Sequence, residues 1–272
     1  MIIDKIKSNI KEFNLQDVFI ALKISSLIIL PFAIEIINEQ ASYYKGININ
    51  YWLFGVILST IVTLLIYKSF YMPIGYKVKL DNKSFIIALL GLIFLKTGGW
   101  LISWLNNFED PQNQKVWEDI WNKNQDQLHY YVIDSVVVAP VIEEVLFRGI
   151  LFFAVYMLIK ELKKWDKWRF SDKTNQYITV ILFILVSGLL FSSIHLSQSF
   201  LTSLPYLFAG LTLAIIFVIT KNLLITIIIH ALSNLTSFNH INEIQTYKLL
   251  SLLLLISIIV WFFNNIKEQS YS

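Results

Sequence analysis

The chain has 272 residues, of which 56% are hydrophobic and only 15% are charged, and its mean hydropathy is +0.61. A soluble domain of this length normally carries more charge and less apolar content, so the composition argues against a soluble fold. The net charge of +3 gives no sign of a nucleic-acid partner, and the lack of cysteine excludes disulfides and thiolate chemistry.

Long apolar blocks recur along the whole chain, and most approach the roughly 20 residues that cross a bilayer as a helix. The blocks are continuously apolar rather than alternating, which favours helices over barrel strands. We therefore predict an all-α membrane protein, a polytopic bundle of about eight transmembrane helices. The predicted spans are Val18–Ile37, Tyr51–Tyr71, Phe85–Leu105, Tyr130–Leu158, Tyr177–Leu196, Leu201–Thr220, Leu223–Phe238 and Tyr247–Phe263.

The polar segments outside these spans also suggest membrane contact. Met1–Gln16 mixes charged residues with periodic isoleucines, which predicts an amphipathic helix on the membrane surface rather than a cleaved signal. The acidic loop Asn106–His129 carries Trp117 and Trp121 four residues apart. That spacing predicts a short interfacial helix on the outer face.

Lysine and arginine are distributed unevenly between the two sides that eight spans would create. One side holds 15 basic residues and the other holds four, and this bias places both termini in the cytoplasm. The larger set is Lys5, Lys7, Lys11, Lys68, Lys77, Lys79, Lys83, Lys160, Lys163, Lys164, Lys167, Arg169, Lys173, Lys221 and Lys267, and the smaller set is Lys45, Lys115, Lys123 and Lys248.

Ionisable residues inside a span point to function, because each costs roughly 2.5–3.5 kcal/mol to insert on translocon scales. Lys23, Glu35 and Asp134 lie near span ends, from where their side chains are expected to reach the headgroups. Lys96 lies deeper in its span. The sequence leaves open whether Lys96 pairs with a carboxylate or lines a cavity.

The fourth span contains the most unusual group of charges, Glu143, Glu144 and Arg148. Helical spacing puts Glu144 and Arg148 on one face, in the favourable order for an ion pair. Glu143 is rotated by about 100° from Glu144, so it should face a different neighbour. Pro140 should bend the helix just before the two glutamates.

Two later spans supply histidines and an amide. His195 ends the fifth span and shares a face with Phe191, whereas His230 and Asn234 share a face of the seventh. His129 and His240 fall in predicted loops and should be solvated.

A buried glutamate, two imidazoles and a carboxamide suit the hydrolysis of an amide bond. The glutamate could take a proton from water, and the imidazole and amide groups could stabilise the oxyanion. Alternatively, Glu143, His195 and His230 could hold a zinc ion with water in the fourth position. The ligand set suits either mechanism, although no His-Glu-x-x-His helix is present to favour zinc.

Three ordered motifs on separate spans carry a family resemblance: Glu143-Glu144-x-x-x-Arg148, Phe191-x-x-x-His195 and His230-x-x-x-Asn234. Together they resemble the CPBP family of CAAX prenyl proteases and bacteriocin-processing enzymes, also called the Abi family. The likeness covers about Asp134–Ser237 and implies an intramembrane endopeptidase, commonly labelled a metalloprotease.

The resemblance also implies roles for the motif residues. Glu143 would be the general base acting on water, Glu144 its supporting carboxylate and Arg148 the group that holds the acidic pair. His195 would orient water or bind metal, and His230 with Asn234 would hold the oxyanion. We favour a mechanism without a tightly bound metal and keep Zn²⁺ as the alternative.

These inferences divide the chain into two parts. Residues 1–128 would form three membrane helices with an amphipathic N-terminus and an acidic outer loop, and residues 129–272 a catalytic five-helix core. The expected partners are the lipid bilayer and a membrane-associated peptide or protein substrate. The alternatives are a non-catalytic immunity or peptide-handling protein and a proton-coupled transporter, although a transporter would be expected to show internal repeats. The abundance of lysine, isoleucine and asparagine suggests an AT-rich bacterial genome, and hence a bacterial plasma membrane. Because bacteria generally lack prenylated CAAX proteins, the family resemblance then implies a peptide pheromone, a bacteriocin leader or another short membrane-associated peptide as substrate.

Overall fold

The computed structural model describes residues 82–107, 109, 132–164, 169–195 and 197–237, with scattered positions within 54–65 and 115–119. The predicted spans Val18–Ile37 and Tyr247–Phe263, the N-terminal amphipathic helix and both loop histidines lie outside the described residues. Tyr51–Tyr71 and the interfacial helix of the acidic loop are described only at scattered positions.

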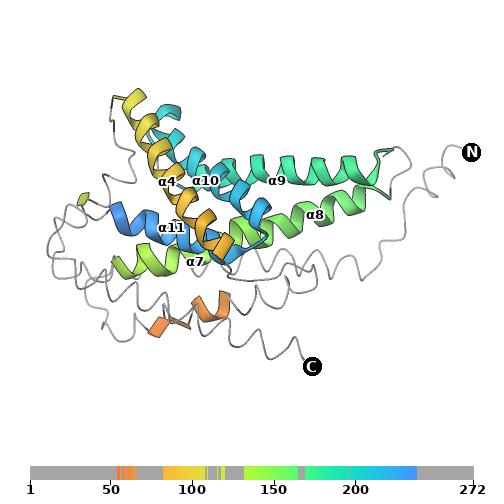
Figure 1. The fold of residues 1–272 in the computed structure, drawn as a ribbon, viewed down its shortest axis with the longest axis horizontal. Coiled ribbons are helices and arrows are strands. Elements are labelled where there is room, and N and C mark those ends of the chain that lie inside the picture. Colours follow the sequence, from red (N-terminus) through yellow and green to blue (C-terminus); the bar gives the residue numbers. More distant parts are fainter. Residues whose placement is uncertain are drawn as a thin grey trace, which may run out of the picture.

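The regular elements of the described ranges are helical, which confirms the predicted all-α class (Figure 1). Three helical segments are long and apolar enough to cross a membrane, namely Ile86–Leu105, Asp172–Ile194 and Phe200–Thr220. The total of about eight spans stays a prediction. The principal elements are α4 (Asn82–Leu105), η3 (Asp134–Val138), α7 (Ala139–Glu144), η4 (Val145–Ile150), α8 (Leu151–Leu162), α9 (Asp172–Ile194), α10 (Phe200–Thr220) and α11 (Leu223–Ser237).

The observed helix ends differ from the predicted span ends where polar residues cap a helix. α9 begins at Asp172, before the predicted Tyr177, because the Ser171 hydroxyl accepts a hydrogen bond from the Thr174 amide at 3.1 Å. Ser199 caps α10 through a reciprocal capping box with Thr202. Hydropathy alone misses such caps, because the first helical turn is polar.

The predicted fourth span is a continuous helical segment made of η3, α7, η4 and α8, called here the fourth segment. Its two π-helical stretches, η3 and η4, flank α7, which ends with the two glutamates. Wide π-helical turns inside α-helices frequently mark functional sites. The bend at Pro140 stays a prediction, but an irregular turn ends two residues before this proline.

Helices α9 and α10 form an antiparallel hairpin that packs at small residues. A Cβ placed on Gly210 would lie 3.0 Å from Gly188 Cα, and one on Gly188 would lie 2.5 Å from the Leu211 side chain. These glycines therefore allow a close approach of the two backbones, as is common in membrane helix pairs. Three aromatic rings, Phe152, Phe183 and Phe217, then join the fourth segment to this hairpin at centroid distances of 5.0–5.8 Å.

Helix α4 lies across α10 and α11 (Figure 1). Gly91 faces Ile216 and Ile229, and Gly98 faces the Phe208 ring, so α4 runs antiparallel to α10. The shared core contains Leu95, Leu213, Ile216, Ile225 and Ile229.

Helix α11 has only 15 residues, and most of its side chains are buried by neighbouring helices. Such burial makes a short helix tolerable inside a membrane bundle, because its ends contact protein rather than lipid. The cross-helix contacts show that α11 runs antiparallel to the fourth segment and that α10 runs antiparallel to α9, as alternating membrane crossings require.

Candidate active site

The charged pair predicted within the fourth segment is formed. Arg148 Nη1 lies 2.9 Å from Glu144 Oε1, and both side chains are fully buried. Arg148 Nη2 also donates to the Gly210 carbonyl oxygen at 3.2 Å, and its guanidinium lies 4.6 Å from the centroid of the Phe191 ring. The arginine therefore connects the acidic pair to both α9 and α10.

The same glutamate oxygen binds a histidine from α11. His230 Nδ1 lies 3.0 Å from Glu144 Oε1. An ionised carboxylate can only accept, so we assign the hydrogen to Nδ1. Glu144 thus fixes the orientation of the imidazole and leaves Nε2 to face the other glutamate.

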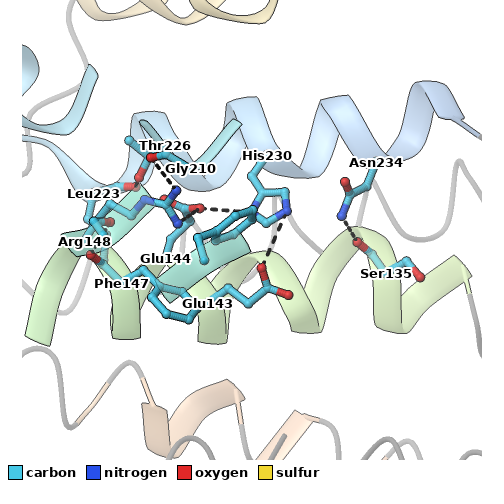
Figure 2. Close-up of polar contacts among 12 residues, drawn as sticks. Ser135, Glu143, Glu144, Phe147, Arg148, Gly210, Leu223, Thr226, His230 and Asn234 are labelled. Carbon is cyan, nitrogen blue, oxygen red and sulfur yellow. Dashed lines mark hydrogen bonds and ion pairs between the residues drawn. The ribbon is translucent and has the colours of Figure 1, made fainter. Parts of the chain in front are cut away.

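The prediction that Glu143 faces a different neighbour from Glu144 is wrong, because His230 presents one ring nitrogen to each carboxylate. The Glu143 carboxylate is buried, with Oε2 3.9 Å from His230 Nε2 (Figure 2). The two successive glutamates therefore approach opposite nitrogens of one imidazole. This arrangement places a carboxylate and an imidazole nitrogen side by side in a site with little solvent exposure.

His195 lies just beyond the end of α9, where the backbone becomes extended. Its Nδ1 is 2.7 Å from the Phe191 carbonyl oxygen, which can only accept, so Nδ1 carries the hydrogen. Its ring stacks on Tyr206 at a centroid distance of 4.2 Å. The Phe191 ring contacts both histidine rings, with centroid distances of 4.7 Å to His195 and 5.6 Å to His230. Phe191 therefore connects the two histidines.

Asn234 points from α11 to the start of the fourth segment. Its Nδ2 donates to the Ser135 carbonyl oxygen at 2.8 Å. Figure 2 shows this contact apart from the group formed by Glu143, Glu144 and His230. One amide hydrogen of Asn234 thus joins two helices, and its role at an oxyanion stays a prediction.

Comparison with known families shows that residues 125–236 match the family described as type II CAAX prenyl endopeptidase Rce1-like. This segment is Rce1-like. The match confirms the resemblance to CAAX proteases predicted from the three motifs, and it supports a protease role in the membrane. No curated protein and no solved structure matches the chain.

The Rce1-like segment contains all the candidate site residues, but they do not form a metal cluster. Within the described ranges, no three His, Cys, Asp or Glu side chains are arranged to hold one metal ion. The Nδ1 atoms of both histidines are hydrogen-bonded, and the proposed zinc ligands Glu143, His195 and His230 do not converge as a set.

One prediction within the Rce1-like segment is wrong. Asp134 was expected to reach the headgroups, but its side chain is buried, with 6% exposure, inside the helix bundle. The error arises because position within a span does not show which side faces neighbouring helices.

Several contacts of the site had no sequence signal. Gly210 and Ser135 contribute backbone carbonyl oxygens, which accept hydrogen bonds from the side chains of Arg148 and Asn234. Tyr206 contributes its ring, which stacks on His195. Nothing in the sequence identified Gly210 as the partner of Gly188 in the close contact between α9 and α10.

Proposed function

We propose that this chain is an intramembrane endopeptidase in which Glu143 activates water to hydrolyse a peptide bond of a membrane-associated peptide or protein. The observation that carries this proposal is the buried arrangement in which Glu144 holds His230 Nδ1 at 3.0 Å while His230 Nε2 lies 3.9 Å from Glu143. The match to a CAAX prenyl endopeptidase family supports the reaction class.

In the proposed reaction, Glu143 takes a proton from water as the water oxygen bonds to the carbonyl carbon of the scissile peptide. The carbonyl oxygen becomes an oxyanion in a tetrahedral intermediate. The intermediate collapses when the carbon–nitrogen bond breaks and the proton held by Glu143 passes to the leaving nitrogen. The products are a carboxylic acid and an amine, so no further reactant is needed.

Glu144 and Arg148 act on the reaction through His230. Because Nδ1 donates to Glu144, His230 can donate a hydrogen bond from Nε2 only when the imidazole is doubly protonated. In that form Nε2 of the imidazolium would stabilise an oxyanion. The buried ion pair with Arg148 holds the Glu144 carboxylate in place.

His195 is proposed to orient the attacking water. With Nδ1 donating to the Phe191 carbonyl, Nε2 of the neutral ring carries a lone pair that can accept from water. Asn234 is proposed to assist the oxyanion with its second amide hydrogen, since the first is bound to Ser135.

The deciding experiment compares purified wild type with Glu143→Gln in detergent, using a quenched fluorescent prenyl-CAAX peptide and, in parallel, a hydrophobic leader peptide. Glu161→Gln is the matched control, because it neutralises an exposed carboxylate of α8 paired with Lys164. We expect Glu143→Gln to abolish cleavage and the control to retain it.

Each preparation is also measured with a strong chelator. Activity that survives the chelator supports water activated by Glu143 alone, whereas activity lost with chelator and restored by zinc would establish the metal alternative. If wild type cleaves no better than Glu143→Gln, the proposed function is wrong and a non-catalytic role takes its place.

A further inference from the structure

Lys96 lies on α4, outside the segment that matches the Rce1-like family, and the sequence left its role open. In the structure its ammonium contacts α11. Lys96 Nζ donates to the Ser233 carbonyl oxygen at 2.6 Å and to the Ser237 hydroxyl at 3.2 Å. Within the described residues, the hydrogen-bond partners of Lys96 are therefore a backbone carbonyl and a hydroxyl group of α11.

A helix C-terminus suits a lysine in an apolar setting. Carbonyl groups of the last turns carry partial negative charge, and lysine side chains hydrogen-bond to them favourably. Ser233 and Ser237 lie in the last turns of α11, and α4 reaches them because Leu95 packs in the core with Ile225 and Ile229. The contact thus offsets the cost of placing an ammonium within an apolar span.

This contact bears on the site because α11 carries His230 and Asn234. The Lys96 acceptor Ser233 immediately precedes Asn234. On its other side, α11 is held by the bonds His230–Glu144 and Asn234–Ser135 to the fourth segment. Lys96 joins α11 to α4 through its hydrogen bonds to Ser233 and Ser237.

We propose that Lys96 is a positioning residue that fixes the last turns of α11 and thereby the placement of His230 and Asn234 against Glu143. This inference rests on the proposed peptidase function. It also assigns the N-terminal part of the chain a part in catalysis, since α4 precedes the matched family segment.

The test compares Lys96→Met, which keeps the length of the side chain without its charge, with Lys96→Arg, which keeps the donors. Thr97→Val is the control, because the Thr97 hydroxyl bonds to carbonyls of its own helix, at Ile93 and Phe94. Three quantities are measured on the full-length protein in detergent. These are kcat and KM for the fluorescent peptide, and hydrogen exchange of the amides of residues 233–237.

We expect Lys96→Met to lower kcat by roughly 10- to 100-fold with KM little changed, because a small misplacement of catalytic groups is costly. Hydrogen exchange of the amides of residues 233–237 should become faster in Lys96→Met. Lys96→Arg should restore most of the wild-type kcat and most of the wild-type exchange rate. The proposal is overturned if Lys96→Met matches Thr97→Val in kcat and exchange, or if Lys96→Arg is as impaired as Lys96→Met.

If Lys96→Met fails to insert, Ser237→Ala replaces it, because it deletes one acceptor and keeps the lysine. The proposal is supported if Ser237→Ala exchanges faster than wild type over residues 233–237 and loses less kcat than is expected for Lys96→Met. It is refuted if both the exchange and kcat of Ser237→Ala equal those of wild type. Should Glu143→Gln prove fully active, the peptidase assignment fails separately. The exchange measurement would then decide whether Lys96 holds α11.

Discussion

Glu144 is the residue that connects the charged groups of the site, because one of its oxygens lies within 3.0 Å of both Arg148 Nη1 and His230 Nδ1. A buried carboxylate oxygen can accept from both donors at once, so Glu144 joins Arg148 and His230 in one contact. Removing Arg148 leaves the buried Glu144 carboxylate without its permanently charged partner. Stability and catalysis are therefore coupled at this residue.

Loss of Arg148 should destabilise the fold strongly. Arg148→Met leaves Glu144 buried at 0% exposure, so we expect the free energy of unfolding to fall by about 3–5 kcal/mol. Lys164→Met removes the exposed pair with Glu161 and should cost about 1 kcal/mol or less. Reversible unfolding in mixed detergent micelles measures both variants, and equal losses would contradict a structural role for the buried pair.

Tyr206 should act on catalysis through the ring of His195. Tyr206→Leu removes the stacked aromatic face, and we expect kcat to fall by roughly 2- to 10-fold, corresponding to the usual strength of an aromatic pair. Tyr206→Phe keeps the stack and should keep most of kcat. Steady-state kinetics on both variants checks this expectation, and an equally impaired phenylalanine variant would show that the hydroxyl matters instead.

At the scale of the elements, the α9–α10 hairpin sets the position of the arginine's backbone acceptor. Gly210 contacts Gly188 across the hairpin, and its carbonyl oxygen receives the Arg148 bond. A side chain at this position would push the two helices apart and move that oxygen. Close packing and the ionic site are thus parts of one contact.

The glycine contact can be tested with a matched pair of alanine substitutions. Gly210→Ala places a methyl group 3.0 Å from Gly188 Cα and should cost about 1–3 kcal/mol of stability and lower activity. At Gly99 no described atom lies within 4 Å of an added Cβ, so Gly99→Ala should be neutral or slightly stabilising. Thermal unfolding and peptide cleavage measure both, and similar losses at the two positions would refute the packing argument.

At the scale of the whole molecule, the fourth segment, α9, α10 and α11 alternate in direction as successive crossings should. The basic residues predict that both termini are cytoplasmic. In that orientation His195, which follows the last residue of α9, lies near the opposite face. The orientation therefore decides the side from which a substrate meets the site.

Single cysteines introduced into this cysteine-free chain test the orientation directly. In intact cells, a membrane-impermeant thiol reagent should label Lys45→Cys and Lys248→Cys. It should label Lys163→Cys and Lys267→Cys only after the membrane is permeabilised. The opposite pattern would invert the topology and place the His195 end of the site in the cytoplasm.

The sequence by itself determined the helical membrane class, the bounds of the central helices to within a few residues, and the motif residues. These features depend on local patterns: an apolar block must be helical in lipid because its backbone must bond internally, and residues four apart share a face. The Glu144–Arg148 pair could be predicted for that reason.

Only the tertiary structure decided how the helices face one another. It showed that His230 binds Glu144 on one nitrogen and faces Glu143 on the other, that Asn234 bonds to Ser135, and that Lys96 reaches the end of α11. Such contacts join residues far apart in the chain. They depend on how each helix is rotated about its axis and how deep it lies in the bundle. A helix that is apolar on most faces can adopt several such rotations, so no local sequence pattern specifies the contacts.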